Sequence, residues 1–333
     1  MFVGSEDAAV DGGVNFAKKP SNAGGASSSQ SQQPSHISIT SSLQQPPQSA
    51  MSGTRHKIST IEAKSPKEAR KVTIFTGQEK PQQPGSGKKR GTAKQQEKDL
   101  IKEFQKCKEG SSTRLDLSSS DITHIPASIK DLIQLTELFL YKNKLASLPN
   151  EIGNLVNLQK LGLSENALQS LPESLCSLTH LQTLDLRHNK LNEIPPVIYK
   201  MVSIENLWFR YNRITCLEES IANLTLLRML DLRENKITSL PSSLGCLKHL
   251  SVCLLCYNHL KSVPSELGQC KELVHLDLQH NEITQLPDSL GNLKNLSRLC
   301  LRYNKLLAIP YTLSNCQKLD EFNVEGNNIP FLP

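Results

Sequence analysis

The 333-residue chain lacks several features that would place it in a common functional class. Aromatic residues make up only 5% of it, with a single tryptophan. No stretch approaches the roughly 20 continuous apolar residues that span a bilayer. Glu6, Asp7 and Asp11 interrupt the region in which a secretory signal needs an apolar run. We therefore expect neither membrane insertion nor secretion.

An excess of positive charge is also absent from the region that we expect to fold. Residues 1–97 carry 13 Lys and Arg against 7 Asp and Glu, which leaves 25 of each sign for residues 98–333 from totals of 38 and 32. A neutral folded region argues against a nucleic-acid partner. The odd number of cysteines, nine, suits a reducing compartment and predicts a cytoplasmic location. The short basic run Lys88-Lys89-Arg90 leaves nuclear entry open.

Composition divides the chain into three segments. Residues 1–97 are rich in Ser, Gln and Pro, cannot bury enough apolar surface to offset the entropy of ordering, and are predicted to be a disordered tail. Residues 98–111 place Leu100, Ile101, Phe104 and Cys107 on one helical stripe, which predicts an N-terminal cap helix. Residues 112–333 have a different and periodic texture.

An asparagine recurs every 23 residues without insertion or deletion, at positions 143, 166, 189, 212, 235, 258, 281, 304 and 327. Each lies within a pattern such as Leu135-Thr-Glu-Leu-Phe-Leu-Tyr-Lys-Asn-Lys-Leu-Ala-Ser-Leu-Pro149, the pattern of leucine-rich repeats. Residues 112–333 hold nine complete repeats and a partial tenth. The sequence predicts the α/β class, a solenoid or horseshoe with a parallel concave sheet and short helical or irregular convex segments.

The repeated polar and proline positions have physical explanations. We expect each Asn to bond backbone groups of neighbouring coils, and each repeated Pro to turn the chain off the strand. Glu218 replaces Pro once, and Ser120 replaces Asn in the first repeat. The chain stops at Leu332-Pro333 without a polar cap, which predicts a fragment, a truncated gene model or a short isoform.

No motif predicts catalysis, a cofactor or a metal site, so the chain is not expected to be an enzyme. Cys253 and Cys256 match a C-x-x-C spelling, but the register places Cys253 in the core and points Cys256 outward. Cys270 and Cys316 fall at core positions, where packing is the expected role. His275, Asp277 and His280 share one coil and could touch a metal, although a polar binding surface is the favoured interpretation.

The concave side is the candidate site. Two residues before each Asn position, three consecutive coils carry Arg187, Arg210 and Arg233. We expect Asp185, Asp231, Glu165 and Glu234 to neutralise part of their charge. Six aromatic residues are expected to point outward nearby: Phe139, Tyr141, Trp208, Tyr211, Tyr257 and Tyr303. Arginine mixed with exposed aromatics favours partner binding over a merely solvated face.

Several strings on this side closely resemble the soc-two (sur-eight) family of leucine-rich repeat scaffolds of the Ras–RAF pathway. They are Thr113-Arg-Leu-Asp-Leu-Ser118, Leu135-Thr-Glu-Leu-Phe-Leu-Tyr-Lys-Asn-Lys-Leu145, Leu184-Asp-Leu-Arg-His-Asn-Lys-Leu191, Arg210-Tyr-Asn-Arg-Ile214 and Leu276-Asp-Leu-Gln-His-Asn-Glu282. The resemblance runs from about Leu100 to Pro333. Members have about twice as many repeats.

The resemblance implies a non-enzymatic scaffold that holds a GTP-loaded Ras-family GTPase and the protein phosphatase 1 catalytic subunit. The complex would dephosphorylate RAF kinase, raise MAP kinase signalling and be recruited to the plasma membrane through the GTPase. The matching strings and the concave register together give this set of partner-binding residues: Arg114, Glu137, Phe139, Tyr141, Asp185, Arg187, His188, Trp208, Arg210, Tyr211, Arg233, His280, Arg298 and Arg302.

Members of this family also dock the phosphatase through a Val-x-Phe peptide in the tail. Val14 and Phe16 have the required spacing and are slightly favoured. Val72 and Phe75 lie nearer the repeats but are one residue too far apart.

Three other functions are alternatives to this one. An extracellular receptor domain would need a signal peptide and Cys-rich caps, and the targeting half of an enzyme would need a catalytic domain. The main alternative is an intracellular adaptor for another GTPase or for cell-polarity proteins.

Overall fold

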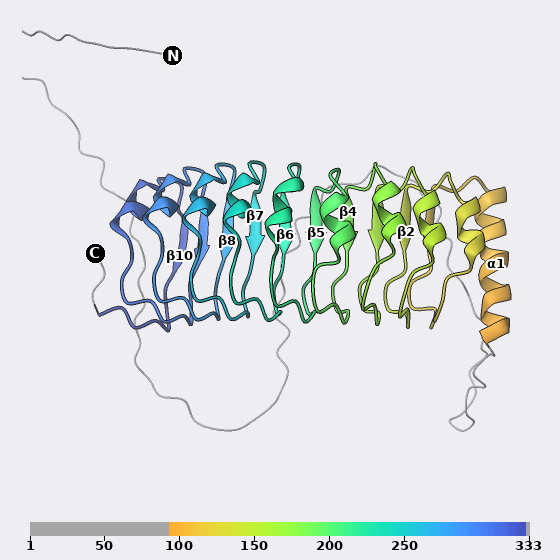
Figure 1. Ribbon diagram of the computed structural model, residues 1–333, viewed down its shortest axis with the longest axis horizontal. Helices are drawn as coiled ribbons and strands as arrows, with labels where there is room; N and C mark the ends of the chain where they lie inside the picture. Colours follow the sequence, from red (N-terminus) through yellow and green to blue (C-terminus); the bar gives the residue numbers. More distant parts are fainter. Residues whose placement is uncertain (1–92, 331–333) are drawn as a thin grey trace, which may run out of the picture. The chain divides into compact units, whose positions relative to one another are not determined.

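A computed structural model describes residues 93–330 and shows one unit repeated along the chain (Figure 1). Each of the first nine coils holds a three-residue strand, a turn and a 3-10 helix before the chain returns to the next strand. The ten strands pair in chain order into a single parallel sheet. They are β1 Arg114–Asp116, β2 Glu137–Phe139, β3 Lys160–Gly162, β4 Thr183–Asp185, β5 Asn206–Trp208, β6 Met229–Asp231, β7 Val252–Leu254, β8 His275–Asp277, β9 Arg298–Cys300 and β10 Glu321–Asn323.

The register of the sheet follows from the 23-residue period. Leu184 pairs with Leu207, which pairs in turn with Leu230, so equivalent residues of successive coils stand side by side. The middle residue of β1 to β9 is fully buried. The first and third residues of each strand point to the other side, because side chains alternate along a strand. The predicted leucine-rich repeat solenoid is confirmed.

A 3-10 helix follows the turn in nine coils of the described range. Pro is the residue before eight of these helices and has φ between −54° and −74°, as its ring requires. The helices are η1 Ala127–Asp131, η2 Asn150–Asn154, η3 Glu173–Ser177, η4 Pro196–Lys200, η5 Glu219–Asn223, η6 Ser242–Cys246, η7 Ser265–Gln269, η8 Asp288–Asn292 and η9 Tyr311–Asn315.

The exception, Glu218, shows how the chain manages without proline. Its free N–H donates a hydrogen bond to the hydroxyl of the buried Tyr199, at 3.3 Å. Tyr199 belongs to the preceding coil, at the position where several other coils have Gly. A donor that proline would have removed is therefore paired by a side chain.

The repeated asparagines form a ladder between coils, as expected. Asn212 donates from Nδ2 to the carbonyls of Leu186 at 2.9 Å and Phe209 at 3.0 Å, and its Oδ1 accepts from the N–H of Leu191 at 3.1 Å. The other asparagines of the ladder make the same pattern, for example Asn281. Each Asn thus joins its own turn to the preceding coil.

The first coil is covered by helix α1, Ala93–Glu109, which begins earlier than the predicted cap helix of residues 98–111. Leu100, Phe104 and Cys107 are buried as predicted, but Ile101 is 41% exposed, so its placement on the packed stripe was wrong. The Gln96 amide of α1 donates to the carbonyl of Asp121 at 2.8 Å. In residues 93–330, no helix is long and apolar enough to cross a membrane.

Candidate functional site: the strand face

Side chains that leave the sheet on the side away from the leucine core form what we call the strand face. It consists of four columns with one residue per coil: the first strand residue, the third strand residue, and the residues two and three positions after the third. All of the predicted partner-binding residues of the repeats belong to these columns. The tail candidates Val14, Phe16, Val72 and Phe75 lie outside the described residues.

The arginine ladder occupies three neighbouring coils. Arg187 donates two hydrogen bonds to Asp185, from Nε to Oδ1 at 2.9 Å and from Nη2 to Oδ2 at 2.6 Å. Asp231, which is fully buried, receives Arg233 in the same way at 2.8 and 2.6 Å. The hydrogen bond to the aspartate raises the pKa of each arginine. These arginines are therefore held in one orientation before any partner arrives.

The middle arginine is held differently because Trp208 takes the third strand position of its coil. Trp208 lies in register between Asp185 and Asp231. Arg210 has no carboxylate two residues before it, so it reaches forward to Glu234 Oε1, with Nε at 2.9 Å and Nη2 at 2.5 Å. Glu234 therefore has the predicted role.

Glu165 does not neutralise an arginine, which corrects the prediction. It pairs with Lys142 at 3.8 Å in the preceding coil. Both residues sit in the fourth column, where the backbone adopts a left-handed conformation with φ of 54° at Lys142 and 57° at Glu165. Glu234 has the same left-handed backbone, with φ of 55°, and also pairs with the preceding coil, but that coil supplies Arg210 where the coil before Glu165 has Tyr141.

Tyr141 lies flat over the neighbouring strand instead of standing outward. An added Cβ at Gly162 would meet the Tyr141 ring at 2.3 Å, so only glycine leaves room for it there. Burial, and then the charge of Asp185, raise the pKa of Tyr141 to about 12. Phe139 stacks beside it with ring centroids 5.4 Å apart. The sequence signal that we missed is a glycine at a third strand position.

The first coils carry a compact ionic and aromatic group. Arg114 lies over the Phe139 ring, 4.4 Å from its centroid, and its Nη1 donates to Glu137 Oε2 at 2.8 Å. Lys160 donates to the other oxygen of Glu137 at 2.9 Å. Although burial acts to raise the pKa of Glu137, the hydrogen bond from Lys160 and the charge of Arg114 lower it. This group joins three coils.

The fourth column forms an aromatic ladder that sequence reasoning did not foresee. Its residues have left-handed φ values, between 50° and 58° apart from the terminal glycine. His188 stacks on Tyr211 with centroids 4.4 Å apart, and His280 lies between Tyr257 and Tyr303 at 4.2 and 4.5 Å. Tyr211, Tyr257 and Tyr303 are exposed as predicted, whereas Phe139, Tyr141 and Trp208 are half-buried.

The last coils contain the remaining predicted binding residues. Arg298 pairs with Glu321 at 3.1 Å, and Arg302 pairs with Glu325 at 2.7 Å. In both cases the carboxylate belongs to the following coil. The arginines of this region are therefore linked along the array, as Arg210 is to Glu234.

The cysteines lie on the sides of the sheet that the register predicted. Cys253, Cys270 and Cys316 are core residues, and Cys256 leaves the sheet on the strand face, but its neighbours cover it and it is only 3% exposed. Its thiol lies against Asp277 and Gln279, and burial is the main cause that raises its pKa. In residues 93–330, no group of three or more His, Cys, Asp or Glu side chains is placed to hold a metal ion.

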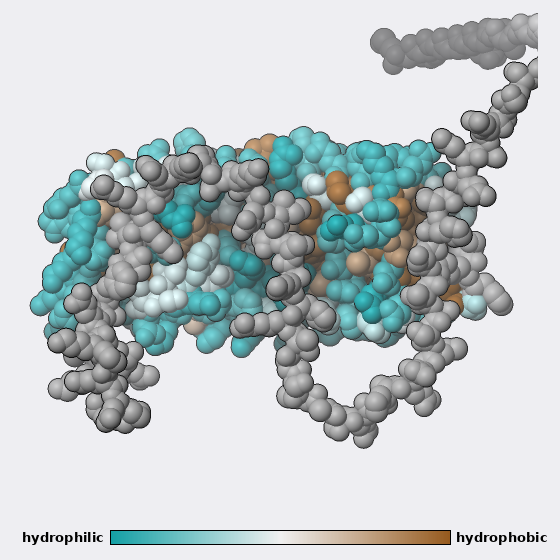
Figure 2. All heavy atoms as spheres, turned by 180° about the vertical axis from the view of Figure 1, so that it is seen from behind, coloured by the Kyte–Doolittle hydropathy of each residue, from teal (hydrophilic) through white to brown (hydrophobic). Residues whose placement is uncertain are grey.

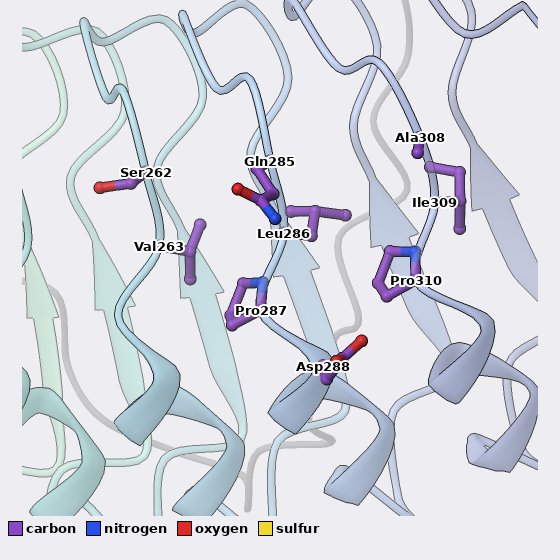
Figure 3. Close-up of a pocket in the computed structure, with 9 residues that line it drawn as sticks. All are labelled: Ser262, Val263, Gln285, Leu286, Pro287, Asp288, Ala308, Ile309 and Pro310. Carbon is purple, nitrogen blue, oxygen red and sulfur yellow. The ribbon is translucent and has the colours of Figure 1, made fainter.

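A pocket of about 360 Å³ lies away from the strand face, where strands lead into 3-10 helices (Figure 3). Val263, Leu286 and Ile309 form its apolar wall, and Pro287 and Pro310 stand beside them. Its polar side chains, Ser262, Gln285 and Asp288, are not arranged as a nucleophile and base. On the face opposite that of Figure 1, hydrophobic side chains gather between hydrophilic margins (Figure 2).

Comparison with known proteins identifies the repeats. The family described as "Leucine-rich repeat region" matches residues 113–212, "Leucine rich repeat" matches 248–306 and 271–329, and "Leucine Rich Repeat" matches 226–247. A solved leucine-rich repeat protein of Leptospira interrogans superposes with a TM-score of 0.65 at 37% identity, covering 67% of this chain and 57% of that one.

Curated relatives carry a more specific name. The leucine-rich repeat protein soc-2 of Caenorhabditis elegans is 72% identical over 47 residues, which are 14% of this chain and 8% of that protein. The soc-2 homolog of Drosophila erecta is 46% identical over 129 residues, or 38% of this chain and 18% of that protein. The matches therefore span less than a fifth of the length of these relatives.

Proposed function

Since this chain is a leucine-rich repeat protein with stretches of close similarity to soc-2 proteins, we propose that it is a non-enzymatic scaffold of Ras signalling. Its strand face would hold a GTP-loaded Ras-family GTPase and the catalytic subunit of protein phosphatase 1. The phosphatase would supply the chemistry and dephosphorylate RAF kinase, which promotes MAP kinase signalling. The cytoplasm, with recruitment to the plasma membrane by the GTPase, is the proposed place of action.

The observation that carries this proposal is the pre-ordered arginine ladder beside half-buried aromatics. Arg187 and Arg233 are each fixed by two hydrogen bonds to a buried aspartate, so little side-chain entropy remains to be lost on binding. Each guanidinium still has free N–H donors for a carboxylate of a partner. Trp208 between them adds contact area of the kind that dominates interface energies.

Acidic surfaces are the natural complement of this ladder. The guanidinium groups would pair with acidic side chains in the nucleotide-sensing region of the GTPase, while Tyr141 and Trp208 pack against its apolar residues. One face would thus supply orientation through charge and affinity through aromatic burial.

The test is co-elution of the purified chain with the phosphatase catalytic subunit and the GTPase, loaded either with a GTP analogue or with GDP. We expect a ternary peak only with the analogue. Retention that does not depend on the nucleotide would remove the Ras-effector role and favour an adaptor for another protein. Titration of the phosphatase with peptides 13–16 and 71–75 tests both tail candidates, and failure of both would remove tail docking.

Two variants tie the binding to the strand face. Asp185→Asn loosens Arg187 and should weaken assembly by about 1 kcal/mol or more with the fold intact. Lys200→Ala, which breaks an exposed ion pair with Glu173 between two 3-10 helices, is the control and should leave assembly unchanged. Equal affinity of the two variants would refute the assigned role of Asp185.

A further inference from the structure

Four coils carry an aspartate at the third strand position: Asp116, Asp185, Asp231 and Asp277. In all four, Oδ1 accepts the backbone N–H of the residue two positions later, at 3.2, 3.1, 3.1 and 3.2 Å. This shared bond orients each carboxylate in the same way relative to its strand. The second oxygen, Oδ2, is then the one presented to other groups.

In three of these coils an arginine lies within 4 Å of Oδ2, and in two of them it donates a hydrogen bond to it. Arg187 and Arg233 reach it at 2.6 Å from within their own coils. Arg114 lies 3.6 Å from the Oδ2 of Asp116. The repeat architecture thus uses this carboxylate position as a receptor for a guanidinium.

Asp277 has the same orientation without the arginine. Gln279 stands where Arg187 and Arg233 stand in their coils, and no ion pair joins Asp277 to any residue within 93–330. Its neighbours in register are the apolar or neutral residues Leu254 and Cys300. The Cys256 thiol, a weak donor, is its other hydrogen-bonding contact, and His275 and Arg233 act on it through their charges without a hydrogen bond or ion pair.

This arrangement is unfavourable for the carboxylate. Asp277 is only 8% exposed, and a buried carboxylate needs a counter-charge to offset the loss of hydration. Burial accordingly raises the pKa of Asp277 above its ordinary value. Its two paired counterparts, Asp185 and Asp231, are buried as well but have the guanidinium that Asp277 lacks.

We propose that Asp277 is a receptor for an arginine side chain supplied by the protein that docks on the strand face. The geometry favours arginine over lysine because the sites of Asp185 and Asp231 are bidentate, with Nε on one oxygen and Nη2 on the other. This inference rests on the proposed partner-binding function. It adds to it a contact of opposite polarity, since the ladder donates arginines to the partner and Asp277 accepts one.

The polarity gives the strand face a direction. The central coils present the fixed arginines of the ladder, whereas the coil of β8 presents the buried carboxylate of Asp277. The coil of β8 is the third coil after that of Arg210. A partner with an acidic patch and an arginine at the matching separation would fit in one orientation only. Charge complementarity of this kind contributes mainly to specificity.

The test is an NMR titration of the full chain with two blocked tripeptides, Gly-Arg-Gly and Gly-citrulline-Gly. Citrulline is a neutral analogue of arginine with nearly the same shape. The Gln279 amide reports on the site because it bonds Asp277 directly, and the Arg187 amide is the matched control because its aspartate is already filled. We expect saturable movement of the Gln279 signal with the arginine peptide alone.

Two variants complete the design. Asp277→Asn removes the charge, and Gln279→Arg fills the site from within by recreating the Asp-x-Arg pattern. Each should weaken the tripeptide response about tenfold. A Gln279 signal that stays still, or moves equally with citrulline or in Asp277→Asn, overturns the inference.

The same variants separate this inference from the proposed function. If co-elution with the phosphatase and GTPase fails while the tripeptide response is present, the partner assignment is wrong and the receptor stands. If the complex forms and the tripeptide response is absent, the receptor is wrong and the scaffold stands. Weakened assembly in both variants would support the two together.

Discussion

Asn212→Ala should lower the free energy of unfolding by about 3 kcal/mol, and the structure shows how that figure arises. The substitution removes three hydrogen bonds of a buried amide. Two of the affected groups, the carbonyls of Leu186 and Phe209, keep a second bond from another asparagine of the ladder. The third, the N–H of Leu191, loses the side-chain acceptor that pairs it.

The three lost hydrogen bonds therefore contribute unequally to the change in the free energy of unfolding. Each carbonyl gives up one of two bonds, worth about 0.5–1 kcal/mol. An orphaned buried N–H costs about 1–3 kcal/mol, because neither water nor another acceptor replaces the amide oxygen. The total lies at about 2–5 kcal/mol, with most of it at Leu191.

Urea unfolding monitored by circular dichroism measures the effect, with Asn327→Ala as the control. Asn327 makes the same three bonds in the last described coil but is only half-buried, so water can replace the lost amide. We expect a loss of about 1 kcal/mol there. Equal losses in the two variants, at an unchanged denaturant slope, would refute the argument that burial of the orphaned donor sets the magnitude.

Three further predictions concern single contacts. Gly162→Ala should displace the Tyr141 ring and lower the pKa of Tyr141 from about 12 toward its ordinary value. NMR titration of a Tyr141 ring carbon measures this pKa, and an unchanged value would contradict the close approach of the ring to Gly162. Tyr199→Phe should lower the free energy of unfolding by about 1 kcal/mol in the native chain but not in a Glu218→Pro background, because proline removes the N–H that bonds Tyr199. Thermal unfolding of the four proteins of the double-mutant cycle measures this, and an equal loss in both backgrounds would contradict it. Asp277→Asn should be more stable than the native chain at pH 7, because a raised folded-state pKa penalises folding when the carboxyl is ionised in both states. That advantage should fade as pH falls through the raised pKa toward the ordinary value of 3.8, and an advantage that is constant with pH would contradict the argument.

Much of the fold was predictable because a strict period turns sequence positions into spatial columns. The register of the sheet, the buried strand leucines and the asparagine ladder all follow from the 23-residue spacing and the alternation of side chains along a strand. The pairs Asp185–Arg187 and Asp231–Arg233 were also predictable, since residues two apart on a strand share a side.

What the period does not give is the direction in which a long side chain leans. Tyr141 lies across a strand because the next coil happens to have Gly162, and Arg210 turns forward because Trp208 replaces an aspartate. Glu165 pairs with Lys142 because the coil before it has Tyr141 where the coil before Glu234 has Arg210. Cys256 is buried by its neighbours in adjacent coils, which a single-coil pattern does not contain.

Pairing in strict chain order has a consequence for how binding and folding communicate. Within residues 93–330 each strand pairs with the strand before it and the strand after it, so the array behaves as a one-dimensional series of joints. A partner that contacts several coils at once couples the interfaces between those coils, which in the free chain can open independently of one another. Binding therefore stabilises the interfaces between these coils. A mutation that destabilises one of those interfaces, even far from any direct contact, should lower the measured affinity.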